Sequence, residues 1–299
     1  MNRGYKVEGV HPGEGRGVGI LTPDEASLEE MACLLARQQV AVSRAVVAAG
    51  DWSTALQALQ NEPAVEVVIL AREGGAPSVE PLLDQVTHSD KPTVVCLLGS
   101  DPRLAWRAGA IPAGRLDEAA RRAAAWIRGW DQALISSQLQ EEDDRLLARV
   151  RQLVPGVDRQ RRNAARVLAP ASLSYEARLM IAETAGPDTS ITCSEPVSDS
   201  LAPIREAAAD SAAAAILLTL RLGTEPVGGW VQALAQMAGQ ACAGGALVCV
   251  HLYGPEPQAL AQGEAAVKNA GAIAAESNAA GARLVGLLLR QRATPRPPE

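Results

Sequence analysis

Small polar residues and glycines follow several apolar runs of this sequence, at points where a strand would end and a helix would begin. The free N–H groups and the dipole of a helix start attract anions, and side-chain hydroxyls or amides can add further donors. In a parallel α/β sheet such positions gather beyond the carboxyl ends of the strands, where ligands bind. Serine and asparagine also cap helices without any ligand, so both roles stay open at each position. The candidates for binding an anion or a small substrate are Gly99, Ser100, Ser172, Ser174, Gly254, Ser277 and Asn278.

Stronger catalytic motifs are missing from the sequence. It contains no P-loop, no GxGxxG after a strand, no GxSxG and no HExxH. His11 and His88 fall where exposed residues are expected, and His251 falls within a strand pattern, which favours a core or strand-end role over catalysis. The acidic run at 141–144 is typical of a solvated helix face, because a metal site needs carboxylates that converge on one point. We therefore expect no metal and no cofactor.

The segment Ala-Gly-Ala-Ile occurs twice, at residues 108–111 and 270–273. Each copy comes after an apolar, strand-like run that ends in glycine, and each is followed by a helical pattern. This repeated order predicts a duplicated domain. A full helix precedes the second copy, whereas only residues 100–106 fill that space in the first, which predicts a shortened connection before Arg107.

Strand-like and helix-like patterns alternate along most of the chain. Short apolar runs separated by amphipathic stretches of about 10–15 residues are typical of doubly wound parallel sheets. We expect an α/β fold with mostly parallel sheets and helices on both faces. One long helix is expected from Leu116 to about Ser137. The expected organisation is a lead-in at 1–16, a first domain at 17–138, a helical connector at 139–160, a second domain at 161–292 and a tail at 293–299.

Composition and charge argue against several classes of protein. The 299 residues are 47% hydrophobic and 21% charged, as expected of packed domains rather than a disordered chain. The formal net charge is −6, and no basic run with interleaved aromatic residues occurs, so nucleic acid is not an expected partner. A basic group near the connector is either an anion patch or, as we expect, a packed or solvated helix end; it consists of Arg159, Arg161, Arg162 and Arg166.

Cysteine usage and hydropathy indicate a cytoplasmic protein. The five cysteines are odd in number and form no CxxC pair, and Cys96 and Cys249 lie in strand patterns where a thiol packs as a small apolar group. No apolar run approaches the length of about 18 residues that crosses a membrane, and the N-terminus lacks the apolar segment of a signal peptide. We expect buried free thiols, no membrane partner and a cytoplasmic location.

With this order of elements the chain resembles the acyl-CoA-synthetase-like family, which includes the succinyl-CoA synthetases. Residues 16–135 resemble the second domain of the succinyl-CoA synthetase α subunit, and residues 164–290 resemble a related flavodoxin-like domain. The arrangement is most similar to that of FdrA proteins, through the helix start at 172–177 and the helix pattern at 257–264. The resemblance implies two tandem flavodoxin-like domains. We expect a truncated form, since the CoA-binding-like N-terminal region of FdrA proteins has no counterpart in this sequence.

Three departures from the family's pattern bear on its chemistry. In the synthetases a histidine just before Ala-Gly-Ala-Ile carries a phosphoryl group; here that position is Arg107, whose guanidinium stays protonated and is a poor nucleophile. The family's Ser-Gly-Thr phosphate cradle is replaced by Asp-Glu-Ala at 24–26, whose carboxylates repel phosphate. The Gly-Gly before the second helix is replaced by Pro-Ala at 170–171, which offers one N–H fewer and less backbone freedom. These departures predict a pseudoenzyme with respect to phosphohistidine-linked ligase chemistry.

The resemblance to FdrA proteins implies a role in a protein complex. By that resemblance the chain is expected to be a subunit of a multi-subunit carbamoyltransferase of the oxamate or ureide type, with partner chains supplying part or all of the active site. The implied ligand is a small carboxylate or carbamoyl phosphate, for which Arg107 is either a hydrogen-bond donor or an uninvolved surface residue. The alternatives are a non-catalytic structural subunit, in a hetero-complex or a homo-oligomer, an acyl-CoA ligase subunit with another phosphoryl carrier, and a small-molecule sensor.

Overall fold

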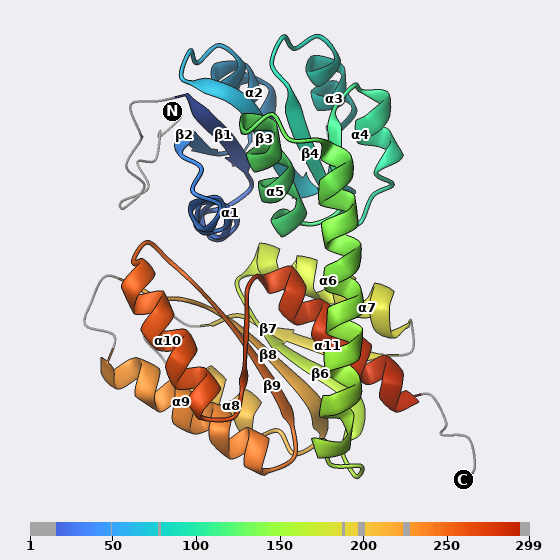
Figure 1. The fold of residues 1–299 in the computed structure, drawn as a ribbon, viewed down its shortest axis with the longest axis vertical. Helices are drawn as coiled ribbons and strands as arrows, with labels where there is room; N and C mark the ends of the chain where they lie inside the picture. Colours follow the sequence, from blue (N-terminus) through green and yellow to red (C-terminus); the bar gives the residue numbers. More distant parts are fainter. Residues whose placement is uncertain are drawn as a thin grey trace. The chain divides into compact units, whose positions relative to one another are not determined.

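The computed structural model describes residues 16–48, 50–76, 79–186, 189–196, 201–223 and 228–293. The chain divides into two compact units, Met1–Gln140 (unit 1) and Glu141–Glu299 (unit 2), each built around a five-stranded sheet (Figure 1). Each unit is described by itself.

Unit 1 is a parallel sheet with the strand order β2-β1-β3-β4-β5. Each strand leads into a helix, so that successive parallel strands are joined by helical crossovers. The strands are β1 (Gly17–Thr22), β2 (Val42–Val47), β3 (Val65–Glu73), β4 (Thr93–Leu98) and β5 (Ile111–Ala113), and the helices are α1 (Glu25–Arg37), α2 (Trp52–Gln60), α3 (Val79–Thr87), α4 (Arg103–Arg107) and α5 (Leu116–Ile127).

Two helical layers cover the sheet of unit 1. Helices α1 and α5 pack against each other, and α2 packs against α3 (Figure 1). Val68 and Leu70 of β3 belong to the same apolar core as Trp52 and Leu82, which come from α2 and α3. Because side chains alternate between the two faces along a strand, Arg72 lies on this α2–α3 face as well.

The helix expected from Leu116 to about Ser137 is in fact two helices. Helix α5 ends at Ile127, and α6 (Gln132–Leu153) begins after a break in which Gly129 has a φ of 64°. Glycine adopts this left-handed conformation without the steric cost that other residues incur, and therefore it ends helices readily. The residues expected as a connector, 139–160, comprise the second part of α6 and the 3-10 turn Val154–Gly156.

Unit 2 is also a parallel sheet, with the strand order β7-β6-β8-β9-β10. Helices α7 and α11 pack together, and α9 packs against both α8 and α10 (Figure 1). The strands are β6 (Arg162–Leu168), β7 (Ser190–Ser194), β8 (Ala213–Arg221), β9 (Leu247–Tyr253) and β10 (Ile273–Ala275), and the helices are α7 (Ala171–Ala185), α8 (Ala202–Ala209), α9 (Gly228–Ala243), α10 (Pro257–Asn269) and α11 (Asn278–Ala293).

The two units share one topology. Numbered from the start of each unit, the strands of both sheets lie in the order two, one, three, four, five. The predicted α/β fold with two tandem flavodoxin-like domains is therefore confirmed. The predicted shortening is also present, because α4 has 5 residues where its counterpart α10 has 13.

Candidate functional site

The repeated fold allows buried positions of unit 2 to be compared with their counterparts in unit 1. In unit 2, Thr219 of β8 pairs with His251 of β9, which pairs with Ala275 of β10. At the same places in unit 1, Ala71 pairs with Cys96, and Cys96 pairs with Ala113. The last helix of each unit begins three residues further on, at Asn278 in α11 and at Leu116 in α5. Residues 219, 251 and 278 of unit 2 thus correspond to residues 71, 96 and 116 of unit 1.

Unit 2 has a buried polar cluster at these positions, consisting of Glu176, Thr219 and Asn278, all fully buried. The hydroxyl of Thr219 donates to Oδ1 of Asn278 at 2.7 Å. Nδ2 of Asn278 donates to Oε2 of Glu176 at 2.8 Å and to the carbonyl of Leu173 at 2.9 Å. A single amide therefore joins the start of α11 to the first turns of α7 and to the central strand β8.

The counterparts of Thr219 and Asn278 in unit 1 are apolar and buried, since Ala71 and Leu116 lie within its core. The fold itself therefore does not require polar groups at these places. Burying a hydroxyl and an amide costs free energy that hydrogen bonds only partly offset. Unit 1 also buries a glutamate, Glu30, at the place of Glu176, but it has neither the threonine nor the asparagine, so this pair marks a candidate functional site in unit 2.

His251 lies beside Thr219 in the sheet and is fully buried. Its Nδ1 is 3.2 Å from the carbonyl oxygen of Ala275, and its ring stacks on that of Tyr253 with the centroids 6.1 Å apart. A carbonyl can only accept, so Nδ1 carries the proton that it donates. This placement agrees with the core role expected for His251.

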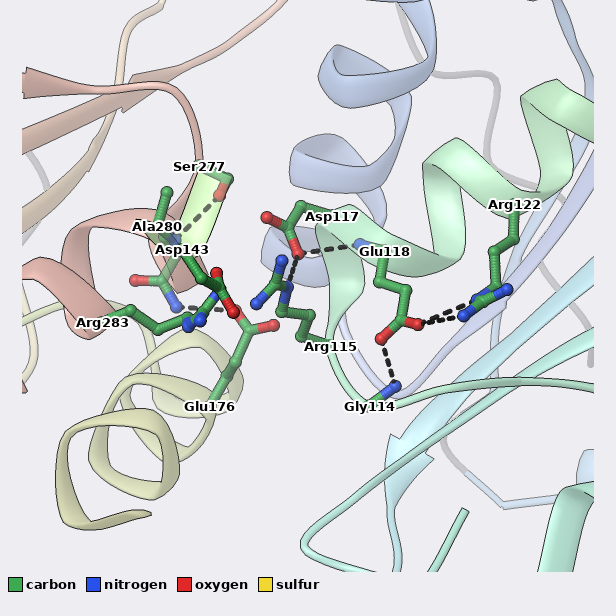
Figure 2. A network of polar contacts seen from close by, with 11 residues as sticks. Gly114, Arg115, Asp117, Glu118, Arg122, Asp143, Glu176, Ser277, Ala280 and Arg283 are labelled. Carbon is green, nitrogen blue, oxygen red and sulfur yellow. Dashed lines mark hydrogen bonds and ion pairs between the residues drawn. The ribbon is translucent and has the colours of Figure 1, made fainter. Parts of the chain in front are cut away.

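The candidate hydroxyls of unit 2 make hydrogen bonds within the protein at the starts of α7 and α11. Oγ of Ser277 accepts from the N–H of Ala280 at 3.0 Å, which caps α11 (Figure 2). Oγ of Ser174 donates to the carbonyl of Ala169 at 2.8 Å, across the start of α7. Ser172 is buried in the first turn of the same helix. The structure thus brings Ser172, Ser174, Ser277 and Asn278 together at the adjoining starts of α7 and α11.

Gly254 lies after the end of β9, against the segment that follows β8. Its φ is 152°, and a Cβ atom placed there would lie 2.3 Å from the carbonyl oxygen of Leu222. Only glycine fits this close approach, so the residue has a structural reason to be glycine apart from any ligand.

The start of α7 carries no side-chain cap. Pro170 is its N-cap residue, and no side chain accepts from the first turn at this position. Pro170 stands before the helix, so its missing N–H leaves the N–H groups of the first helical residues in place, although the N-cap residue itself offers no donor. Ala171 and Leu173 keep N–H groups directed along the helix axis, which suits an anion.

The helix starts of unit 1 hold their own carboxylates instead. Oδ1 of Asp24 accepts from the N–H of Ser27 at 2.8 Å at the start of α1. Oδ1 of Asp51 accepts from Thr54 at 3.0 Å at the start of α2, and these hydrogen bonds with Thr54 lower the pKa of Asp51. A phosphate or carboxylate ligand would have to displace these groups.

The start of α5 is occupied in the same way, as Figure 2 shows. Asp117 forms an ion pair with Arg115, with Nε and Oδ1 2.8 Å apart, and accepts from the N–H of Glu118 at 2.8 Å. Oε2 of Glu118 accepts from the N–H of Gly114 at 2.9 Å, and its Oε1 accepts from Arg122. Internal acidic groups therefore neutralise this helix start, where unit 2 has the uncharged pair Ser277 and Asn278.

The structure separates the remaining sequence candidates. Gly99, with a φ of 77°, and Ser100 follow the end of β4, and Ser100 packs closely against Gly74. Arg107 is the exposed last residue of α4, just before the turn into β5. Arg107 is thus separated along the chain from Gly99 and Ser100 by the short helix α4. Within the described residues, no hydrogen bond joins Arg107 to Gly99 or Ser100.

The basic group near the connector has structural roles in part. Arg161 donates to the carbonyls of Asp210 at 2.9 Å, Ala213 at 2.8 Å and Gly244 at 2.7 Å. Arg166 pairs with Asp210 at 3.2 Å. Both side chains are therefore engaged by groups of the protein itself, as expected if the basic group is a packed helix end and not an anion patch.

The described residues also bear on three further expectations, concerning metal sites, membrane-spanning helices and thiols. No group of three or more histidine, cysteine, aspartate or glutamate side chains there is arranged to hold a metal ion. No helix within those ranges has the length and apolar character to cross a membrane. Cys33, Cys96 and Cys249 are buried thiols, as predicted, whereas Cys193 is exposed and Cys242 is half-buried, so the prediction was wrong for these two. Burial raises the pKa of Cys249 to about 12.

Sequence reasoning overlooked two members of the polar cluster. Thr219 interrupts the apolar run of β8, and Glu176 follows the serines of α7 by a few residues. A polar residue inside an otherwise apolar strand is the one local feature that points to Thr219. Glu176 resembles any helix glutamate until the fold shows that it is buried.

Comparison with known proteins yields no family. No protein-family model matches the chain, and no curated protein does. Among solved structures, the chain is similar to the C-terminal domain of glucosamine-fructose-6-phosphate aminotransferase from Francisella tularensis, with 11% identity, a TM-score of 0.37, and coverage of 92% of this chain and 83% of that one. It is similar to glucosamine-6-phosphate deaminase from Thermotoga maritima, with 12% identity, a TM-score of 0.41, and coverage of 92% and 84%.

An acetyl-coenzyme A synthetase from Ca. Korarchaeum cryptofilum, solved with phosphate and ADP, is also similar. The identity is 14%, the TM-score is 0.38, and the match covers 93% of this chain but 65% of that one. At these scores and identities the likenesses assign no activity to the chain.

Proposed function

We propose that the chain is an FdrA-type subunit of a multi-subunit carbamoyltransferase of the oxamate or ureide type, in which unit 2 binds the small anionic ligand. The observation that carries the proposal is the polar cluster of Glu176, Thr219 and Asn278 at the adjoining starts of α7 and α11, in which Thr219 and Asn278 stand where unit 1 has apolar core residues. The uncapped start of α7 supplies N–H donors, and Asn278 holds the start of α11 beside it.

Carbamoyl transfer suits donors of this kind. The amide nitrogen of oxamate attacks the carbamoyl carbon of carbamoyl phosphate, the C–O bond to phosphate breaks, and phosphate leaves together with the proton that the nitrogen loses. The reaction needs hydrogen-bond donors for the carbonyl oxygen and for the phosphate, but no covalent enzyme intermediate. In this proposal, the backbone N–H groups of Ala171 and Leu173 bind the anion, the polar cluster orients them, and partner chains supply the remaining groups. Arg107, exposed at the end of α4, has no assigned part.

A matched pair of variants tests the proposal. Glu176 and Glu30 are buried glutamates, each the sixth residue of the first helix of its unit. Calorimetric titration of the chain with carbamoyl phosphate, and separately with oxamate, is expected to show saturable binding. Glu176→Gln should weaken that binding at least about tenfold, the factor that corresponds to about 1.4 kcal/mol, whereas Glu30→Gln should leave it unchanged. Equal binding by both variants and the original chain would contradict the assignment to unit 2.

A non-catalytic structural subunit is the second candidate. It is favoured by the hydroxyls of Ser174 and Ser277, which are engaged within the protein: Ser174 donates to the carbonyl of Ala169, and Ser277 caps α11. The complex assembled with its partner chains separates the two roles. Carbamoyl transfer that keeps its rate with the Glu176→Gln chain, but is lost when the chain is omitted, would support the structural role.

The acyl-CoA ligase alternative requires a phosphoryl carrier. His251 is fully buried with Nδ1 bound to a backbone carbonyl, which argues against it as that carrier. Incubation of the chain with labelled ATP or acyl phosphate should give no acid-labile, base-stable label. Such a label would support the acyl-CoA ligase alternative and contradict the carbamoyltransferase proposal.

A further inference from the structure

Arg72 is a buried arginine, two of whose nitrogens have no acceptor in the described part of the chain. It lies near the carboxyl end of β3, the central strand of unit 1, with only 8% of its surface exposed. Its guanidinium carbon is 4.3 Å from the centroid of the Trp52 ring, at the start of α2. Within the described residues, Nε and Nη1 are buried and make no hydrogen bond.

This arrangement is costly without a ligand. A buried guanidinium that lacks a counter-ion loses hydration without gaining hydrogen bonds, and the cation–π contact replaces only part of that loss. Burial lowers the pKa of Arg72, which reflects the same desolvation, while the nearby charge of Glu73 acts in the opposite direction. The carboxyl edge of a parallel sheet is also where ligands of such folds bind.

We propose that Arg72 and Trp52 form a second ligand site, in unit 1, for a small monocarboxylate. The carboxylate would accept from the unpartnered nitrogens of Arg72, and the short apolar part of the ligand would meet the core residues Trp52 and Leu97. Glu73 follows Arg72 and Asp51 precedes Trp52, so two acidic residues flank the site in sequence. These charges disfavour a dianion such as phosphate relative to a singly charged carboxylate. The site is independent of the function proposed for unit 2.

The arginine side chains themselves provide the measurement. In a proton–nitrogen spectrum of the arginine Nε–H groups, titration with acetate should shift the Arg72 signal along a saturating curve. The exposed Arg103 is the internal control, and its signal should move only linearly with added salt. Sodium phosphate at equal ionic strength should bind at least about tenfold more weakly than acetate. A linear response of the Arg72 signal to both anions would overturn the proposal. Equally tight binding of phosphate and acetate would contradict the preference for a monocarboxylate and indicate a site for oxyanions in general.

Variants give a second readout that does not depend on the spectrum. Acetate should raise the urea midpoint of the original chain but not that of Arg72→Met, since a ligand that binds only the folded state stabilises it. Without ligand, Arg72→Met should be at least as stable as the original chain, because it removes a desolvated charge. A marked loss of stability in Arg72→Met, with no acetate effect on the original chain, would instead make Arg72 a packing residue. Glu176→Gln should keep the acetate response, so failure of the unit 2 proposal is distinguishable from failure of this one.

Discussion

Asn278 donates from Nδ2 to Oε2 of Glu176 at 2.8 Å, and the two residues are 102 positions apart in the sequence. The bond joins the first residue of α11 to the second turn of α7 in the interior of unit 2. The amide also accepts from Thr219. Because every one of these groups is fully buried, the loss of one leaves the others without water to replace it.

Replacement of Asn278 by leucine, the residue at the corresponding position of unit 1, should destabilise unit 2. Glu176, Thr219 and the Leu173 carbonyl would each lose a hydrogen-bond partner in a buried place. We expect a loss of about 2–4 kcal/mol in the free energy of unfolding, measured by urea denaturation. Asn269→Leu, the same change at the exposed end of α10, should cost less than about 0.5 kcal/mol. Similar losses for the two variants would contradict a special role of Asn278.

The Thr219–Asn278 hydrogen bond should appear as a coupling energy. Thr219→Val keeps the shape of the side chain and removes only the hydroxyl donor. We expect Thr219→Val to cost about 1–3 kcal/mol alone but much less in the Asn278→Leu background, where the acceptor is already gone. A double-mutant cycle in urea measures the difference. Strictly additive losses would mean that the hydroxyl contributes nothing through Asn278.

The Cys249 thiol should make unit 2 less stable at high pH. Burial raises the pKa of Cys249 from 9.0 to about 12, so the folded state holds the proton that the unfolded state releases. Stability from this group is therefore complete below about pH 9 and falls between pH 9 and pH 12, by up to about 1.4 kcal/mol per pH unit. The difference in unfolding free energy between the original chain and Cys249→Ala should be constant from pH 7 to 8.5 and shrink above pH 9. A difference that stays constant to pH 11 would show that the thiol ionises equally in both states.

Arg161 should contribute to stability, unlike the neighbouring Arg159. Arg161 donates to three backbone carbonyls of unit 2, whereas Arg159 is exposed. Arg161→Ala should lower the free energy of unfolding by about 2–3 kcal/mol, since hydrogen bonds from charged donors contribute more than neutral ones. Arg159→Ala should change it by less than about 0.5 kcal/mol. Equal effects of the two substitutions in thermal or urea denaturation would instead indicate that the whole basic group is a solvated helix end.

Local patterns in the sequence determined the fold class. Largely apolar runs such as residues 65–70 and 213–222 predicted buried strands, because parallel strands covered on both faces are mostly apolar. The repeated Ala-Gly-Ala-Ile segments predicted a duplication, and both sheets have the same strand order. The same local reasoning failed at Gly129, because a helical pattern continues across the glycine and only the backbone conformation shows the break.

The candidate site depended on the tertiary structure. Ser277 and Asn278 were recognisable as a helix start, but their neighbours were not, since Glu176 and Thr219 come from other elements far along the chain. The sequence also cannot show that two nitrogens of Arg72 are buried without an acceptor among the described residues, or that Arg107 is exposed at the opposite end of α4 from Gly99 and Ser100. Periodicity along a chain reports which face of an element is apolar, whereas hydrogen bonding and burial depend on which elements the folded sheet brings together. The alternation of elements was therefore determined by sequence, and the polar cluster of unit 2 by the packing of α7 and α11 on the sheet.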